Sequence, residues 1–495
     1  MTTLRKLILT CLVEAVLLSS AVVAKAQFTF TTNNGAITIT EYTGTNDNVV
    51  IPDETNGLPV TSIGVAAFEL CTSLTSLTIP NSVTIIESGA FEYCTSLTSV
   101  TIPNSVTNFG SSAFEQCDSL TSVTLGSGVT SIGSAAFASC ASLISVTIPN
   151  SVTSIGSLAF FGCSSLTSVM IPNSVTNIGS DAFAECTSLT NITVDPNNPA
   201  YGSIDGVLFD VNQATLIQFP TGLGGNYLIP NSVTSIGSGA FEYSANLTSV
   251  TIPNSVTSIG EGAFYDCTSL TNITVDPDNL AYSSVGGVLF DVKQATLIQF
   301  PGGLGGNYSI PNSVTSIENG AFEYCANLTS VKIPNGVANL GSDTFVYCFS
   351  LTSVMIGSGV TNVGNSAFFD CNHLRHILFS GNVPSLSSYA FYGDNATVYY
   401  LPETTGWGST YGGLPALLWN PQMQIADGSF GVKANGFGFN LTGTTNISLV
   451  VDACTNLAGG IWVPLQTNTL TSGSLYFSDP QWTNYRSRFY RLRSP

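Results

Sequence analysis

Ten cysteines are the residues of this 495-residue chain whose type and spacing suggest chemistry most directly. Each follows a phenylalanine by three positions: Cys71, Cys94, Cys117, Cys140, Cys163, Cys186, Cys267, Cys325, Cys348 and Cys371. Cysteines can form disulfides, bind soft metals or act as nucleophiles. A free cysteine also packs as a small hydrophobic residue, and Ser244 takes the same place once. We therefore expect a column of buried thiols whose parallel side chains do not meet in disulfide geometry.

Two histidines near the end of this column could bind a metal together with Cys371. His373 and His376 would supply imidazole ligands of the kind that zinc prefers. By register they replace Ser96 and Ser99 of an earlier repeat, which are expected at the surface, whereas Cys371 belongs to the buried column. Because the three side chains should not converge, we predict no metal and no other cofactor.

A glutamate follows the phenylalanine in several repeats and forms an interrupted acidic stripe: Glu69, Glu92, Glu115, Glu242 and Glu323. Paired carboxylates can perform acid–base chemistry or hold a cation weakly. A periodic acidic column is more often a solvated face that keeps a protein soluble. The chain also lacks G-x-S-x-G, H-E-x-x-H and P-loop sequences. We predict that it is not an enzyme.

A repeat of 23 residues positions all of these side chains. It is marked by Phe68, Phe91, Phe114, Phe137, Phe160 and Phe183, then by Phe241 and Phe264, and finally by Phe322, Phe345, Phe368 and Phe391. Two gaps of 58 residues interrupt the series, and we interpret each as one repeat plus an insertion of 35 residues. About twelve coils are therefore expected.

The apolar positions within one repeat predict short strands. Leu97, Val100 and Ile102 fit the L-x-x-L-x-L pattern of leucine-rich repeats, and Pro103 ends the strand because it has no amide hydrogen. A second extended piece is expected at 106–109, and a helical or 3₁₀ turn at 110–117. Since one repeat cannot bury its own apolar side, the repeats must stack. The fold class is therefore mainly β, a leucine-rich-repeat solenoid.

The two insertions, near 195–228 and 276–309, are almost copies of each other. The apolar runs Val207–Val211 and Ala214–Pro220 of the first match runs that begin at Val288 and Ala295 in the second. Two apolar runs joined by a short polar turn are typical of a β-hairpin. We expect one β-hairpin in each insertion.

The repeat is similar to that of a known family. The segment from Ile229, which reads I-P-N-S-V-T-S-I-G-S-G-A-F-E-Y, resembles the BspA-type leucine-rich repeat, and the G-V-L-F-D-V and Q-F-P runs resemble an insertion common in that family. Residues 36–44 with 57–64 resemble its usual start, and 399–407 its closing repeat. The resemblance covers about residues 35–420. It implies a bacterial surface or secreted protein, in some members an adhesin for host or matrix proteins.

The ends of the chain differ from the repeats. Residues 1–26 have a basic start, an apolar run and an Ala24-Lys25-Ala26 cleavage site, which predict a signal peptide and therefore a secreted or cell-surface protein. Residues 27–58 are expected to form an N-terminal β cap ahead of the solenoid at 59–420. Residues 421–495 alternate apolar and polar residues without the repeat and predict a small β-sandwich-like domain.

The charge of the chain limits its partners. With a formal net charge of −19 it should repel nucleic acid and anionic lipid. Outside the signal peptide no stretch is apolar enough for a membrane span. Four basic residues gather in the last ten positions, and an export or attachment signal there is one hypothesis: Arg486, Arg488, Arg491 and Arg493. We expect a monomer.

The remaining candidate site is the outer face of the strands. Two hydroxyl residues per coil should point outward there: Ser76, Thr78, Ser99, Thr101, Ser122, Thr124, Ser145, Thr147, Ser249 and Thr251. Met170, Lys332 and Met355 interrupt the pattern. One interpretation is a binding face for an extracellular protein or polysaccharide. The alternative is a lattice that binds a periodic ligand, either a polysaccharide or ice, and duplicated residues that only cover a surface are a third possibility.

Overall fold

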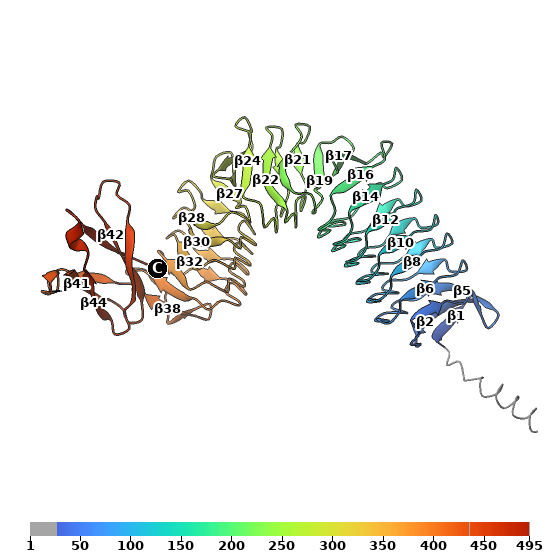
Figure 1. Ribbon diagram of the computed structural model, residues 1–495, viewed down its shortest axis with the longest axis horizontal. Coiled ribbons are helices and arrows are strands. Elements are labelled where there is room, and N and C mark those ends of the chain that lie inside the picture. Colours follow the sequence, from blue (N-terminus) through green and yellow to red (C-terminus); the bar gives the residue numbers. More distant parts are fainter. Residues whose placement is uncertain (1–26, 435, 495) are drawn as a thin grey trace, which may run out of the picture. The chain divides into compact units, whose positions relative to one another are not determined.

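The computed structural model describes residues 27–434 and 436–494, which are almost entirely β-strands and turns (Figure 1). In these ranges the single helix is the 3₁₀ segment Trp482–Asn484, and no helix has the length and apolar character to cross a membrane. The predicted signal peptide lies outside the described residues. The chain divides into two compact units, residues up to 223 with 239–244, and residues 224–238 with the rest of the chain from 245.

The first unit begins with a hairpin of β1 (Phe28–Asn33) and β2 (Ala36–Tyr42), which pair in antiparallel fashion. The ring of Tyr42 stacks on Phe68 with centroids 5.2 Å apart, so the hairpin covers the first ring of the core. Three short strands complete this region: β3 (Asn48–Val50), β4 (Glu54–Thr55) and β5 (Leu58–Ile63).

Each coil of the first unit contributes one strand to a parallel sheet. The members that follow β3 are β6 (Ser76–Thr78), β8 (Ser99–Thr101), β10 (Ser122–Thr124), β12 (Ser145–Thr147), β14 (Ser168–Ile171) and β16 (Asn191–Val194). Equivalent residues pair directly, as in Val100 with Val123 and Val123 with Val146. This register confirms the period inferred from the sequence.

A second, shorter row of strands follows the turn after each outer strand, where most coils have a proline. In the first unit it consists of β7 (Ile85–Ile86), β9 (Asn108–Phe109), β11 (Ser131–Ile132), β13 (Ser154–Ile155) and β15 (Asn177–Ile178). The prediction of a helical or 3₁₀ turn at 110–117 was wrong, because residues 111–116 form non-helical turns. Instead, alternate amides bond to the next coil, Phe114 N to Ala136 O and Gln116 N to Ala138 O, both at 2.8 Å. These bonds satisfy the turn backbone without a helix.

The core of both units is a column of stacked phenylalanine rings. The ring centroid of Phe91 lies 4.9 Å from that of Phe68 and 4.9 Å from that of Phe114. The centroids of Phe322 and Phe345 are 4.8 Å apart. These side chains are completely buried. Offset stacking of this kind adds to the apolar burial that holds neighbouring coils together.

The insertions contain one strand more than the predicted hairpin. In the first, β17 (Tyr201–Ile204), β18 (Val207–Asp210) and β19 (Thr215–Gln218) are antiparallel, and the second repeats this with β25 (Tyr282–Val285), β26 (Val288–Asp291) and β27 (Thr296–Gln299). Each insertion also returns a ring to the core, because Phe219 lies 5.2 Å from Phe241 and Phe300 lies 5.1 Å from Phe322.

The second unit repeats the two rows of strands. Its outer strands are β20 (Gly225–Leu228), β22 (Leu247–Ile252) and β24 (Asn272–Val275) in one sheet, and β28 (Gly306–Ser309), β30 (Leu328–Lys332), β32 (Ser353–Ile356), β34 (His376–Phe379), β36 (Thr397–Tyr400), β38 (Leu414–Leu418) and β37 (Thr410–Tyr411) in another. The shorter row consists of β21 (Ser235–Ile236), β23 (Ser258–Ile259), β29 (Ser316–Ile317), β31 (Asn339–Leu340), β33 (Asn362–Val363) and β35 (Ser385–Leu386).

The C-terminal residues of the second unit form two antiparallel sheets, which we call the C-terminal module. One contains β39 (Gln422–Gln424), β40 (Gly431–Lys433), β41 (Gly436–Thr442) and β44 (Ser474–Asp479), and the other contains β42 (Ser448–Cys454), β43 (Val463–Thr469) and β45 (Phe489–Arg493). Phe439, Leu449 and Phe477 are buried in its core. The basic end of the chain is thus part of a sheet, in which β45 pairs with β42.

Candidate functional site

Eight of the ten predicted face residues come together on one sheet. Those from Ser76 to Thr147 lie on β6, β8, β10 and β12, are exposed, and line up in two rows across the strands. Ser249 and Thr251 lie on β22, in a different sheet. The hydroxyl of Ser249 donates to Asn226 Oδ1 at 2.8 Å, so it is already engaged within the protein.

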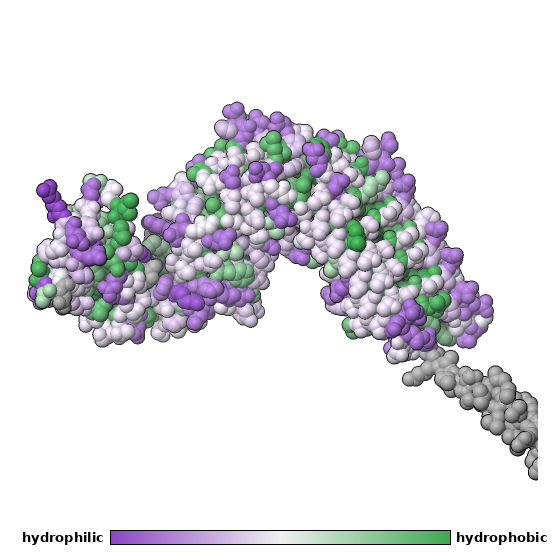
Figure 2. Space-filling view, in the orientation of Figure 1, coloured by the Kyte–Doolittle hydropathy of each residue, from purple (hydrophilic) through white to green (hydrophobic). Residues whose placement is uncertain are grey.

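The hydroxyls beside these rows have a structural role. Thr98 Oγ1 donates to Thr75 O at 3.2 Å, and Thr121 Oγ1 donates to Thr98 O at 3.0 Å. Thr352 repeats the bond to Thr329 O at 2.9 Å in the second unit. These bonds join one coil to the next where each strand begins. Figure 2 shows mainly pale residues of intermediate hydropathy over the coils, as expected for a surface of Ser, Thr and Gly.

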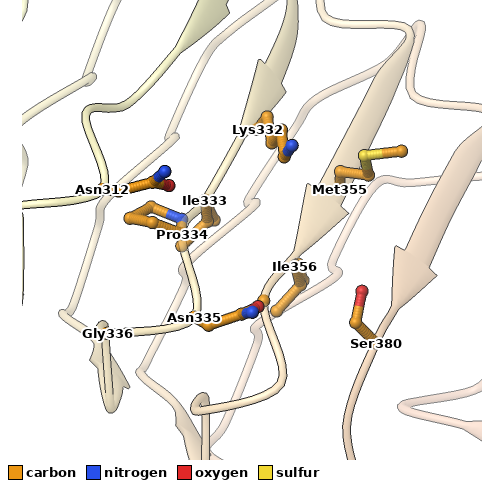
Figure 3. Close-up of a pocket in the computed structure, with 10 residues that line it drawn as sticks. Asn312, Lys332, Ile333, Pro334, Asn335, Gly336, Met355, Ile356 and Ser380 are labelled. Atoms are coloured by element: carbon orange, nitrogen blue, oxygen red, sulfur yellow. The ribbon is translucent and has the colours of Figure 1, made fainter.

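The second unit has a pocket of about 350 Å³ at the carboxyl ends of β30 and β32 (Figure 3). This volume lies at the lower end of the range for small-ligand sites, about 300–1,000 Å³. Its lining is Asn312, Lys332, Ile333, Pro334, Asn335, Gly336, Met355, Ile356, Gly357 and Ser380. The pocket lies where Lys332 and Met355, which interrupt the hydroxyl pattern, project from β30 and β32.

The strand register places the key side chains of the pocket next to each other. Lys332 and Met355 are direct partners on β30 and β32. Both side chains are exposed, whereas Ile333 and Ile356, the next residues along the two strands, are buried in the core of the coils. An ammonium group and a flexible thioether therefore lie side by side at the pocket, whose lining also includes the amides of Asn312 and Asn335.

Glycine at position 357 helps to shape this pocket. In most coils a proline follows the outer strand, but here Gly357 does, and a Cβ atom on it would lie 2.5 Å from Pro334 C and O. The coils can therefore approach closely at this point. Ser358 N donates to Asn335 Oδ1 at 3.0 Å, which fixes the asparagine side chain at the pocket edge.

The electrostatic character of the pocket comes from Lys332. The chain carries a net charge of −19, and Lys332 is one of few cations in its repeats. Among the described residues, the ion pairs of 4.0 Å or less involve arginines and aspartates of the C-terminal module, and Lys332 is not among them. An exposed ammonium beside amide and hydroxyl groups favours a ligand with a carboxylate and several hydroxyls.

The C-terminal module covers the strands beyond the pocket. Across β32, β34, β36 and β38, outward residues pair in the order Met355, Leu378, Tyr399 and Leu417. Leu378 and Tyr399 are buried in the core of the module, and Trp419 Nε1 donates to Ser448 O at 3.2 Å. The open part of this sheet therefore ends beside Met355. Leu378 and Tyr399 occupy an outward position that carries Ser or Thr in most other coils. This change to apolar residues could have predicted that the module covers the strands here, but it was not recognised from the sequence.

The cysteines form the expected column and are poor nucleophiles there. Eight of the ten thiols donate to a phenylalanine carbonyl of the preceding coil, as Cys94 Sγ does to Phe68 O at 3.2 Å and Cys117 Sγ to Phe91 O at 3.3 Å. The thiols from Cys94 to Cys186 are free and buried. Burial raises the pKa of the Cys94 and Cys140 thiols, and a protonated thiol is unreactive.

The other candidate groups do not assemble into a site. His373 is exposed with Nδ1 2.6 Å from Phe349 O, whereas His376 is half-buried against Tyr399, and burial lowers its pKa. Across residues 27–434 and 436–494 no group of three or more His, Cys, Asp or Glu is arranged to hold a metal ion. In the glutamate stripe, burial and then Glu115 raise the pKa of Glu92.

The comparisons with known proteins agree with this architecture. Residues 41–163, 130–224, 225–305 and 306–407 match the BspA type leucine-rich repeat region. A leucine-rich cell surface protein from Faecalibacterium prausnitzii is 34% identical over 72% of this chain and 94% of its own, with a TM-score of 0.49. A leucine-rich repeat protein from Eubacterium ventriosum is 24% identical over 74% and 87%, with a TM-score of 0.40.

A third solved structure, the pneumococcal vaccine antigen PcpA, is 17% identical over 80% of this chain and 98% of its own, with a TM-score of 0.43. Among curated proteins none matches this chain significantly. The matched repeats cover well over half of the 495 residues. This chain therefore belongs to the BspA-type leucine-rich repeat family.

Proposed function

We propose that the protein is a non-catalytic adhesion protein outside the cell, and that the outer face of its strands binds a protein or glycan. The pocket at Lys332 is the observation that carries the proposal. It combines a cation, a thioether and amides on an ordered sheet, in a chain with a net charge of −19 and few cations in its repeats. Such a pocket suits a carboxylate of the ligand, either on an acidic side chain or on a uronic sugar.

The rest of the molecule supports a binding role. Stacked repeats present a long, rigid surface, which is how solenoid proteins usually bind their partners. The thiols are buried in the core, and the two histidines lie in different environments. The family includes the cell surface protein of Faecalibacterium prausnitzii, which fits export by a signal peptide at residues 1–26. The proposed working form is a monomer.

An array of matrix proteins, acidic peptides and neutral or uronic saccharides tests this function. The full chain is compared with Lys332→Glu and with Lys293→Glu, which changes a second exposed lysine in the same unit. We expect binding to a carboxylate-bearing probe that Lys332→Glu weakens about tenfold or more, an effect of about 1.4 kcal/mol. Lys293→Glu should bind as the wild type does. Absence of binding across the array, or equal loss in both variants, would refute the proposal.

The hydroxyl rows of the first unit favour a second candidate, a periodic ligand. On successive strands Ser99, Ser122 and Ser145 pair with one another. Thr101, Thr124 and Thr147 do the same, so the two rows have identical register. Ice or a crystalline polysaccharide would match such a lattice. Ice binding would appear as thermal hysteresis that a Thr101→Lys, Thr124→Lys double variant abolishes. If a solution of the wild-type protein shows no thermal hysteresis, ice is excluded as the ligand.

A further inference from the structure

A continuous row of aromatic side chains runs along the turns of the second unit. We call it the aromatic ridge, and its members are Tyr265, Tyr324, Tyr347, Phe349, Phe369, Tyr389 and Tyr392. Each ring lies within 6.1 Å of the next, and the closest pair, Tyr324 and Tyr347, is 4.8 Å apart. The row belongs to turns that follow the core phenylalanines, so it is separate from the strand face and from the pocket.

Several rings of the ridge are open to solvent. Tyr389 is 63% exposed, Tyr392 58% and Phe349 39%. The remaining rings are half-buried. Aromatic rings that are connected side by side and yet accessible form a patch of the kind that marks an interaction surface.

The fold itself does not require aromatic residues at these positions. The position two residues after the core phenylalanine is variable in the first unit, where it is occupied by Leu70, Tyr93, Gln116, Ser139, Gly162, Glu185 and Tyr243. The backbone there is left-handed, with φ of 54° at Tyr324 and 56° at Tyr347, close to the 55° of Gln116 and 68° of Gly162. Bulky residues are disfavoured in this conformation. The same turn accepts Gln, Ser and Gly as well as Tyr, so the fold does not require an aromatic ring at this position.

The chemistry of the ridge suits a neutral, linear polysaccharide, and we propose this class of ligand. From Tyr324 the row passes through Tyr347 and Phe369 to Tyr392 by one coil at a time, and the spacing of these rings, 4.8, 5.9 and 5.0 Å, is close to the length of one pyranose unit. Aromatic faces pack against the apolar faces of sugar rings, while phenol hydroxyls bond to sugar hydroxyls.

Charge favours a neutral chain over an acidic one. The acidic groups nearest to the Tyr324 hydroxyl are Asp266 and Glu323, and Asp370 lies over the backbone of Gly393, next to Tyr392. These carboxylates would repel a polyanion and accept hydrogen bonds from sugar hydroxyls. The ridge proposal is independent of the strand-face function, because the two use different residues.

Depletion of the full chain from solution by insoluble cellulose, chitin and xylan tests the ridge. The test variant combines Phe349→Ala, Tyr389→Ala and Tyr392→Ala, which removes the three most exposed rings without touching the buried column. Leu280→Ala, a change at an 88% exposed residue of the same unit, is the matched control. Thermal unfolding checks that all variants fold.

We expect the wild-type chain to be depleted by at least one neutral polysaccharide, and the triple variant to bind about tenfold more weakly or worse. Leu280→Ala should bind as the wild type does, and Tyr392→Phe, which keeps the ring, should retain most of the affinity. No depletion by any of the polysaccharides, or equal depletion by the triple variant, would overturn the proposal. So would sedimentation that shows wild-type dimers and triple-variant monomers, because the ridge would then join two copies of this chain.

Discussion

The carboxyl group of Asp394 lies next to Cys371, at the place in the internal column that a cysteine thiol fills in the preceding coil. Both side-chain oxygens of Asp394 are inaccessible to solvent, and the backbone of Cys371 offsets only part of this burial. Burial raises the pKa of Asp394 to about 8, and the nearby Asp370 adds to this effect. The last coil of the column therefore holds a carboxyl group that is largely protonated at neutral pH.

Asp394 should make the stability of the second unit depend on pH. Between its ordinary pKa of about 4 and the folded value of about 8, the folded chain holds a proton that the unfolded chain has released. The free energy of unfolding should therefore fall as pH rises through this window. Asp394→Asn should remove this dependence, and Asp394→Cys should do the same while completing the column.

Thermal unfolding at several pH values between about 5 and 9 would measure this effect. The difference between wild type and Asp394→Asn should be small at the acidic end and should favour the variant at the alkaline end, by on the order of 1–3 kcal/mol. Asp53→Asn, at an exposed position of the first unit, is the control. If the wild type and Asp394→Asn lose stability equally as pH rises, Asp394 is not the group responsible for the pH dependence.

Ser244 should be a weak point in the column of the first unit. It replaces a cysteine, is completely buried, and its hydroxyl oxygen has no hydrogen-bond partner. Ser244→Cys should raise the free energy of unfolding by about 1–2 kcal/mol, because a thiol tolerates burial better than an unsatisfied hydroxyl. Urea unfolding under reducing conditions measures the gain. Ser232→Cys, on an exposed turn, should show no gain in the free energy of unfolding. A Ser244→Cys variant less stable than the wild type would contradict the prediction that the buried hydroxyl is unfavourable.

Asp452 should hold the C-terminal module together. Its carboxylate is 2% exposed and pairs with Arg491 Nη2 and Arg493 Nε, both at 3.0 Å. Asp452→Ala would leave two cations near a buried site and should destabilise the module by about 3–5 kcal/mol. Tryptophan fluorescence during urea unfolding reports on the module through Trp462 and Trp482. Arg486→Ala, which changes an exposed arginine, should have little effect, and equal stability of both variants would argue against the ion pairs.

The contact between the C-terminal module and the solenoid should depend on Leu378 and Tyr399. These outward residues are 6% and 2% exposed and belong to the apolar core of the module. Leu378→Asp would place a charge in this core, so the module should unfold or detach before the coils do. Limited proteolysis should then release a fragment near residue 420. Met355→Asp, at the open neighbouring position, should remain as resistant as the wild type. Resistance of Leu378→Asp would mean that the contact is weak.

The period of the repeat could be predicted because it rests on local apolar positions. Leu97, Val100 and Phe91 have the same burial in every copy, so one repeat predicts the sheet register, the ring column and the thiol column. The rings of Phe219 and Phe300 escaped notice, because the insertions place them 22 residues before the next core phenylalanine instead of 23.

Features that depend on distant residues were harder to predict. The basic end suggested an export or attachment signal, but Arg491 pairs with an aspartate 39 residues earlier, which no local pattern indicates. Lys332 and Met355 looked like defects in a hydroxyl lattice. In the structure the same two residues are direct partners on neighbouring strands and line a pocket. The hydroxyl face itself stays a prediction.

Hydrogen–deuterium exchange tests the central claim, that the outer strand face near Lys332 binds the ligand, most directly. The full chain would be measured with and without the array probe whose binding depends on Lys332. The account predicts slower exchange in β30, β32 and residues 334–336, and unchanged exchange in the aromatic ridge and in β42. Protection confined to the turns or to the C-terminal module, with none in β30 and β32, would contradict it.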